Sequence, residues 1–242
     1  MTTTINKEEI QKFSKLADEW WDVNGKFKPL HMFNPIRIEY ITDKIKHHFK
    51  IKDSKSNFLN RLNILDIGCG GGLISEPMAR LGGSITGIDA SEKNIKVAKI
   101  HSQKSGLKIN YLNKSPEQLN DIEKFDIILN LEIVEHVDNV GLYIESCYKL
   151  LKKGGLMFTA TLNRSLISYL KAIIGAEYIL KWLPIGTHDW NKFLKPEELE
   201  KLLQDKKFST VDIKGLEFNP ILNKWKKSNN LSVNYIISSS KN

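Results

Sequence analysis

Apolar, strand-like segments alternate with helical segments over most of this chain, beginning near residue 62. The first segment, LNILDIG, is followed by a glycine-rich loop and by a helical stretch that ends near Leu81. The same order then repeats, with strands expected at 62–68, 84–90, 108–114, 125–131 and 156–163, and helices at 91–106 and 139–151. Consecutive βαβ units form parallel sheets, because each helix crosses back over one face of the sheet. The pattern therefore predicts an α/β fold with a doubly wound parallel sheet that helices cover on both faces.

The last part of the chain departs from this alternation. A helix is expected from Pro196, because proline is favoured in the first helical turn. Two strands follow at 209–218 and 233–239 without a helix between them, which predicts an antiparallel hairpin. We therefore expect a seven-stranded, mostly parallel sheet with a C-terminal antiparallel hairpin. Residues 164–192 interrupt the scheme as a helical insertion, and the polar residues 219–232 interrupt it as well.

The first 55 residues are expected to form helices outside the sheet. Residues 6–21 place apolar side chains at helical spacing, and residues 36–50 have the pattern of a second helix. Asn-Gly, Lys-Pro and Asn-Pro pairs in residues 22–35 predict a loop between them. A chain of 242 residues with 41% hydrophobic residues can bury a sizeable core. We expect one domain over residues 1–242, with residues 1–55 as a helical lid.

The net charge of +8 raises the question of nucleic-acid binding. Only four of the 36 basic residues are arginines, which read phosphate and guanine best, and the lysines are scattered along the chain. We therefore expect a solvated surface and no nucleic acid as a partner.

Two cysteines without a CxxC pair argue against a disulfide framework or a structural zinc site and fit a reducing cytosol. The polar N-terminus predicts no signal peptide, and the charges within residues 166–183 argue against a membrane span, so a cytoplasmic protein is expected.

The loop after the first strand reads GCGGG at residues 68–72. In a doubly wound sheet the ligand lies at the carboxyl ends of the strands, where glycines let the backbone approach it closely. Asp89 ends the second strand, a position from which a carboxylate accepts hydrogen bonds from ribose hydroxyls. A nicotinamide-binding fingerprint, GxGxxG, would require a glycine where this chain has Leu73. The loop, with the acidic Asp66 before it, resembles that of the S-adenosylmethionine (AdoMet) methyltransferases of the seven-stranded class.

Three further segments resemble the ubiquinone-biosynthesis O-methyltransferases: WWDVNGKFKPLHMFNPIRIEYI at 20–41, LEIVEHV at 131–137 and GTHDWNKFLKPEEL at 186–199. The resemblance covers nearly the whole chain, and the first segment is its most specific part. It implies a Rossmann-like fold and transfer of a methyl group from AdoMet to the phenolic oxygen of polyprenylated hydroxyphenols and catechols. It also implies cofactor-binding roles for Arg37, Gly68, Gly70, Asp89 and Leu131. An arginine can hold the carboxylate of the methionine moiety through paired hydrogen bonds.

The segment LEIVEHVD places two glutamates and a histidine directly after the expected fourth strand. If a helical turn begins near Glu132, then Glu132, Glu135 and His136 share one face. Two carboxylates and an imidazole suit a divalent cation such as Mg²⁺, which would favour the phenolate form of the substrate. An alternative stays open, because related methyltransferases without a metal carry part of this pattern, and in them a glutamate or a histidine orients the loop or serves as base. In that case His136 is a candidate for the catalytic base, and His188 is a second candidate for substrate contact or proton acceptance.

Residues 164–183 are rich in Leu, Ile, Tyr and Trp and contain few charges. They predict either a helix or helical pair at a bilayer interface, which suits a lipid-tailed substrate, or an internal lid. We therefore expect an anionic membrane surface at the inner face of the cytoplasmic membrane as a partner, beside the substrate and other enzymes of ubiquinone synthesis. Two other functions also agree with the sequence: a small-molecule methyltransferase with another acceptor, and a methyltransferase-like module that binds nucleic acid.

Overall fold

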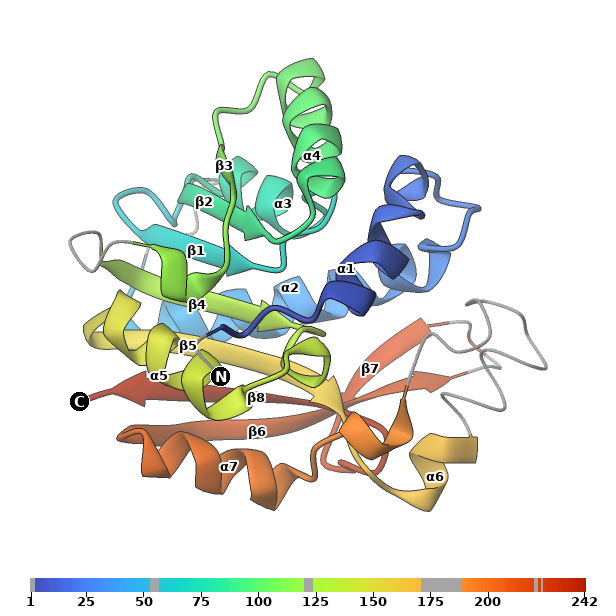
Figure 1. Cartoon of the computed structure of the whole chain (residues 1–242). Coiled ribbons are helices and arrows are strands. Elements are labelled where there is room, and N and C mark those ends of the chain that lie inside the picture. Colours follow the sequence, from blue (N-terminus) through green and yellow to red (C-terminus); the bar gives the residue numbers. More distant parts are fainter. Residues whose placement is uncertain (1–2, 53–56, 120–123, 171–188, 220–221, 223) are drawn as a thin grey trace.

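One mixed sheet forms the centre of the protein, whose computed structural model describes residues 3–52, 57–119, 124–170, 189–219, 222 and 224–242. The strands are β1 (Asn63–Ile67), β2 (Ser84–Asp89), β3 (Asn110–Asn113), β4 (Phe125–Leu131), β5 (Leu151–Leu162), β6 (Phe208–Asn219), β7 (Lys224–Ser228) and β8 (Asn234–Lys241). Their order in the sheet is β3-β2-β1-β4-β5-β8-β6-β7 (Figure 1). Strands β3 to β5 run parallel, whereas β8, β6 and β7 pair antiparallel. The predicted parallel sheet with an antiparallel C-terminal part is confirmed.

Helices lie on both faces of this sheet (Figure 1). They are α1 (Lys7–Ser14), α2 (Lys28–His48), α3 (Ser75–Arg80), α4 (Glu92–Lys104), α5 (Val140–Leu150), α6 (Leu166–Ser168) and α7 (Pro196–Asp205). Short 3₁₀ helices add η1 (Ala17–Glu19), η2 (Pro116–Gln118), η3 (Val134–His136) and η5 (Trp190–Lys192). Among the described helices, none is long and apolar enough to cross a membrane.

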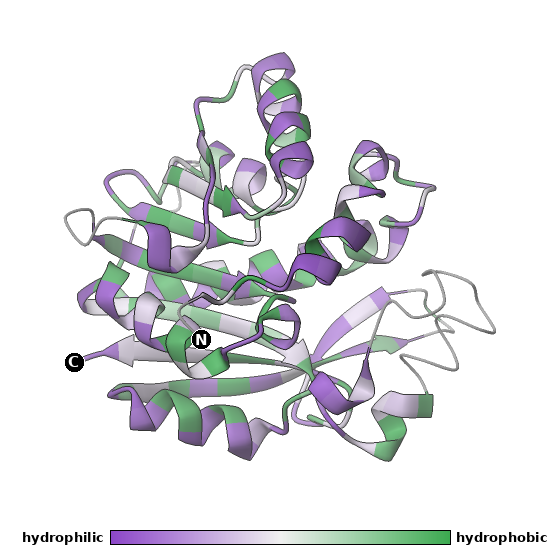
Figure 2. Ribbon diagram, viewed as in Figure 1, coloured by the Kyte–Doolittle hydropathy of each residue, from purple (hydrophilic) through white to green (hydrophobic). Residues whose placement is uncertain are grey.

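The hydrophobic core has two halves, one on each face of the sheet, because successive side chains of a strand point to opposite faces. On one face Ile127 of β4 packs in a cluster with Ile41 of α2 and Met78 of α3. On the other face its neighbour Ile128 packs in a cluster with Tyr143 of α5. Hydrophobic residues accordingly gather in the strands between these helices (Figure 2). Parallel strands buried on both faces require such continuous apolar runs, which is why these segments are easy to recognise in the sequence.

The N-terminal helices differ from the prediction. The sequence predicts one continuous first helix, but α1 ends at Ser14 and η1 follows as a separate turn. Helix α2 begins at Lys28, inside the segment 22–35 for which a loop is predicted. Pro29 is compatible with this start because a first-turn residue needs no backbone N–H, and Pro35 lies inside the helix. The side chains that α2 buries against the sheet stabilise the longer helix despite its internal proline.

The sheet has an eighth strand that the sequence analysis misses. Strand β7 lies within residues 219–232, which appear in the sequence only as a polar interruption. Its Trp225 lies opposite Phe218 of β6 and packs against Phe33 of α2, with 4.2 Å between the two ring centroids and 33° between the ring planes. The other side chains of β7 are mostly lysines, which suit an edge strand because they discourage pairing with another chain. Among the described residues the sheet has eight strands, one more than the seven expected.

The N-terminal segment lies against the carboxyl edge of the parallel strands (Figure 1). The hydroxyl oxygens of Ser14 and Ser91 lie 2.6 Å apart and join the end of α1 to the start of α4. Trp20 Nε1 donates to Asn94 Oδ1 at 3.0 Å. Trp21 Nε1 donates to the carbonyl oxygen of Gly71 at 2.9 Å. These contacts fasten residues 14–21 over the edge where a doubly wound sheet binds its ligand.

Candidate active site

The glycine loop between β1 and α3 turns through three residues with positive φ: Gly68 at 69°, Gly70 at 54° and Gly72 at 91°. These values lie in the left-handed region, which glycine adopts without strain. A Cβ added to Gly68 would also lie 2.8 Å from Cδ1 of Ile133. A Cβ added to Gly70 would lie 2.4 Å from the ring of Trp20. Both conformation and packing therefore require glycine at these two predicted cofactor residues.

Asp89, at the end of β2, is tied to this loop. Its Oδ2 accepts a hydrogen bond from the backbone N–H of Gly70 at 3.0 Å. Its Oδ1 accepts from the backbone N–H of Ser91 at 2.7 Å and from Asn94 Nδ2 at 3.3 Å. Burial raises the pKa of Asp89 above its usual value, although these hydrogen bonds to the charged form lower it. The carboxylate is thus held in one orientation at the strand edge.

A cavity of about 130 Å³ opens beside this carboxylate. Gly68 and Asp89 line one side of it, and His136 lines another. Glu9 and Phe13 of α1 also line the cavity. The cavity therefore lies between the glycine loop, the segment after β4 and α1.

The segment after β4 does not form the helical turn that the sequence predicts. Glu132 has a φ of 55°, and its backbone N–H donates to the carbonyl oxygen of Ala160 at 2.9 Å. Helical geometry begins only at Val134, with η3. Glu132 therefore does not share a helix face with Glu135 and His136, and the expectation of a helical turn that begins near Glu132 is wrong. Among the residues that the structure describes, no three His, Cys, Asp or Glu side chains gather as a metal-ligand set.

The three side chains of this segment have separate partners instead. Oε1 of Glu132 lies 3.3 Å from Nη1 of Arg37. Oε2 of Glu135 accepts a hydrogen bond from the hydroxyl of Thr161 at 2.8 Å. Nδ1 of His136 lies 3.0 Å from Oε2 of Glu9. The histidine is thus directed toward α1, Glu132 toward Arg37 of α2, and Glu135 toward Thr161 of β5.

Glu135 is 4% exposed, and its Oε1 has no hydrogen-bond partner among the described residues. Burial raises the pKa of Glu135 well above its usual value, and the nearby carboxylate of Glu132 raises it further. Asp66 on β1 is buried too, and burial raises its pKa to about 7, although Ser75 donates a hydrogen bond to it at 2.6 Å. Burial thus raises the pKa of two carboxyl groups near the cavity, Glu135 beside its lining residue His136 and Asp66 beside its lining residue Ile67.

Arg37 of α2 is the cation that faces these acids. It is 3% exposed, and its Nη2 donates to Oδ1 of Asn34 at 2.7 Å. Its guanidinium lies 4.2 Å from the ring centroid of Phe33. Burial lowers the pKa of Arg37, whereas Glu132 and Asp66 raise it. Arg37 Nε is buried without a hydrogen-bond partner among the described residues, so one donor is available to a further acceptor.

The predicted site residues thus fall into three groups. Gly68, Asp89 and His136 line the cavity together with Glu132. Gly70, Arg37, Leu131 and Glu135 are not among its lining residues and lie next to those that are. His188 lies outside the described residues. The sequence analysis missed Glu9, because nothing in the pattern of α1 distinguishes it from its neighbour Glu8.

Comparison with known proteins shows the family of this chain. Residues 65–159 match the family model described as "Methyltransferase domain". The chain is 59% identical over 239 residues to the ubiquinone biosynthesis O-methyltransferase of Pelagibacter ubique, covering 99% of both chains. It is 51% identical over 236 residues to the protein of the same name from Chelativorans sp., covering 97% of this chain and 93% of that one. A solved structure of the magnesium protoporphyrin IX methyltransferase from Synechocystis PCC 6803 with bound SAM has a TM-score of 0.63 at 16% identity, covering 99% of this chain and 100% of that one.

The sheet order and the glycine loop at the end of β1 define the class as an AdoMet-dependent methyltransferase. The sequence identity to the two relatives, which extends over nearly the full length, shows the family within that class. The chain belongs to the ubiquinone biosynthesis O-methyltransferase family.

Proposed function

We propose that this enzyme transfers the methyl group of AdoMet to the phenolic oxygen of polyprenylated hydroxyphenols and catechols in ubiquinone synthesis. The full-length relation at 59% identity to an enzyme with that name carries the proposal. The cavity supports it, because two side chains with suitable chemistry line the same space. They are the carboxylate of Asp89, which is expected to bind the cofactor, and the imidazole of His136. Incubation with AdoMet and a short-chain demethylated quinol tests it, since a methyl ether must form at the phenolic oxygen.

AdoMet, when bound, supplies a methyl group on a sulfonium centre. We propose that Asp89 accepts hydrogen bonds from its ribose hydroxyls and that Gly68 and Gly70 allow the loop to approach it closely. The buried Nε of Arg37 fits the carboxylate of the methionine moiety, because this donor has no partner among the described residues. Residues 1–55 would act as the lid, which the position of α1 along the cavity supports.

His136 is proposed as the group that receives the phenolic proton. A phenol with a pKa of about 10 is a weak nucleophile at neutral pH, so a base beside it raises the rate. His136 lines the cavity, and its Nε2 has no hydrogen-bond partner among the described residues. His188 remains a second proposed proton acceptor and lies outside the described residues.

A divalent cation is the second candidate for activating the phenolic oxygen. The observation behind it is the Oε1 atom of Glu135, which has no hydrogen-bond partner among the described residues and lies near the carboxylate of Glu132. Two oxygen donors fit Mg²⁺ when water and substrate oxygens complete the shell. A bound cation would also reverse the pKa rise of Glu135, because it favours the charged carboxylate. His136 could join this set only through Nε2, because its Nδ1 lies against Glu9.

Chelation tests this cation. If it is required, excess chelator should lower kcat at least about tenfold, because several kcal/mol of charge stabilisation would be lost. AdoMet affinity measured by calorimetry should stay unchanged, since Asp89 lies at another strand. Added Mg²⁺ should restore the activity of the wild type. Full activity in metal-free buffer with chelator would remove the cation from the mechanism and leave His136 as the base.

We also propose reversible binding to an anionic membrane surface, at the cytoplasmic face, through residues 164–183. Their described part supports this, because Leu166 is 77% exposed and Leu170 is 58% exposed. Exposed leucines at the start of an apolar segment suit the boundary between headgroups and acyl chains. A lipid-tailed substrate would be taken from the same surface.

In the double variant Leu166→Asp, Leu170→Asp, the partition coefficient onto anionic liposomes, measured by flotation, should be at least about tenfold lower than in the wild type. The reason is that each leucine withheld from the bilayer costs about 1.5–3 kcal/mol. Val211→Asp serves as the control, because Val211 is an exposed apolar residue of β6, 46% exposed, outside this segment. Equal flotation of the wild type and both variants would favour an internal lid.

A further inference from the structure

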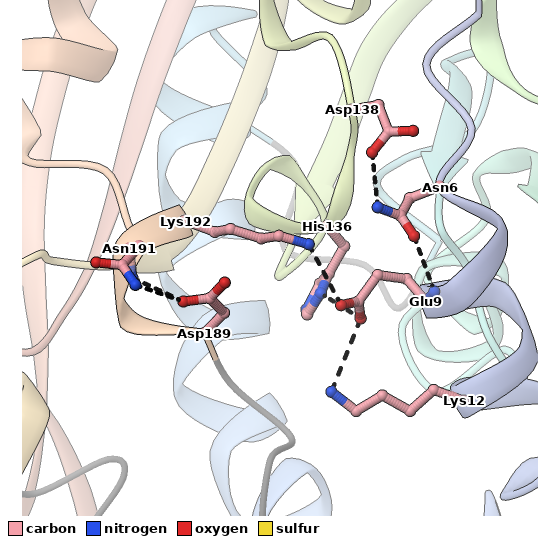
Figure 3. Close-up of polar contacts among 8 residues, drawn as sticks. All are labelled: Asn6, Glu9, Lys12, His136, Asp138, Asp189, Asn191 and Lys192. Carbon is pink, nitrogen blue, oxygen red and sulfur yellow. Dashed lines mark hydrogen bonds and ion pairs between the residues drawn. The ribbon is translucent and has the colours of Figure 1, made fainter.

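Glu9 of α1 and His136 of η3 meet although 127 positions separate them in the sequence (Figure 3). We propose that Glu9 is a positioning residue, whose carboxylate orients the His136 ring and keeps its hydrogen on Nδ1. The inference rests on the proposed role of His136 as the group that receives the phenolic proton. It adds a residue of the N-terminal helix to the catalytic apparatus.

The chemistry of the contact fixes the tautomer. A neutral imidazole donates a hydrogen bond from one ring nitrogen and accepts at the other. An ionised carboxylate only accepts, so Nδ1 of His136, 3.0 Å from Oε2 of Glu9, must be the donor. The lone pair then lies on Nε2, which has no other partner among the described residues. The hydrogen bond with His136 lowers the pKa of Glu9 to about 2, so the carboxylate stays ionised at neutral pH.

The surroundings of Glu9 hold its carboxylate in place. Asn6 caps α1 by accepting from the backbone N–H of Glu9 at 3.0 Å. Its Nδ2 donates to Oδ1 of Asp138 at 2.6 Å, which ties the start of α1 to the segment after η3 (Figure 3). Lys12 and Lys192 lie 3.8 Å and 3.6 Å from the Glu9 carboxylate and keep it charged.

The ring itself is held on a second side. Phe13, one turn further along α1, packs edge to face with His136 at 5.1 Å between centroids and 82° between planes. The His136 side chain is 11% exposed and that of Glu9 is 17% exposed, so water competes weakly for their hydrogen bond. A carboxylate behind a catalytic imidazole, with one ring nitrogen left to the cavity, is the arrangement by which proteins set the role of a histidine.

A purely structural role makes a different prediction. If Glu9 only fastens α1 over the cavity, its loss should loosen α1 and weaken AdoMet binding, because Phe13 and Glu9 line that cavity. If Glu9 positions His136, its loss should lower kcat and leave the KM for AdoMet unchanged. The two kinetic constants therefore separate the two roles.

The test compares Glu9→Gln with Glu8→Gln, using the full chain, AdoMet and a short-chain demethylated quinol. Glu8 is exposed in the same helical turn, so its variant removes an equal charge without touching His136. We expect Glu9→Gln to lower kcat roughly 10- to 100-fold, as for other residues that orient a ligand or catalytic side chain. The Glu8 variant should match the wild type. An unchanged kcat in Glu9→Gln with a raised KM for AdoMet would overturn the proposal.

Long-range ¹H–¹⁵N spectra of the histidine rings supply an independent readout. We expect the wild-type His136 ring to carry hydrogen on Nδ1, and Glu9→Gln to shift it toward Nε2, because an amide also donates hydrogen bonds. Identical His136 spectra in both proteins would overturn the proposal. The variant His136→Gln identifies the His136 signals in these spectra. It also tests the proposed function separately, because a full kcat in His136→Gln would show that His136 is not the base. A low kcat in His136→Gln beside a normal kcat in Glu9→Gln would reject only the role of Glu9.

Discussion

Asp89→Ala should weaken AdoMet binding by about 1.5–3 kcal/mol, since hydrogen bonds to a charged carboxylate are lost. This corresponds to about a tenfold to hundredfold rise in Kd. The loss has a second source, because the same carboxylate accepts from the backbone N–H groups of Gly70 and Ser91 and so fixes the glycine loop. Isothermal titration calorimetry with AdoMet measures the effect directly.

Asp126→Ala is the matched control for that titration. Asp126 lies at the opposite end of the sheet, near the start of β4, where its carboxylate accepts from the backbone N–H of Asn63 and pairs with Lys152. Its loss should leave AdoMet affinity unchanged. Equal affinity of the wild type and Asp89→Ala, with both proteins folded, would remove Asp89 from the cofactor site.

His136→Ala should lower kcat by roughly 10²- to 10⁴-fold, the usual contribution of a positioned general base. AdoMet affinity should change little, because Asp89 and the glycine loop lie on β1 and β2 and not on η3. Steady-state rates with a short-chain demethylated quinol, together with calorimetry, separate the two quantities. His48→Ala is the control, since His48 lies at the end of α2 and contacts the carbonyl oxygen of Gly154. A normal kcat in His136→Ala would contradict the role of His136.

The parallel part of the sheet could be predicted from the sequence because its signals are local. Strand β4 covers residues 125–131, the range predicted from the apolar run. The glycine loop could be recognised for the same reason, since positive φ and close packing at Gly68 and Gly70 require glycine. Strand β7 could not be predicted from the sequence. One aromatic residue, Trp225, supplies its packing, and its exposed lysines give it the composition of a polar loop.

The site after β4 needed information that the sequence pattern does not contain. Glu132 has a left-handed φ of 55°, and its backbone N–H donates to the carbonyl oxygen of Ala160 of β5. The spacing of Glu132, Glu135 and His136 suits a helix, but this backbone conformation is not helical, and helical geometry begins only at Val134. The pairing of His136 with Glu9 likewise joins two distant segments, and only the packed fold brings them together.

Product analysis tests the central claim most directly. The full chain is incubated with AdoMet and a short-chain demethylated quinol, and the products are identified by mass spectrometry and NMR. We expect a methyl ether at the phenolic oxygen and an equimolar amount of S-adenosylhomocysteine, and no product without the quinol. A folded protein that binds AdoMet in the same buffer, with Mg²⁺ present, yet forms no methyl ether from any phenol or catechol offered would contradict the proposed function.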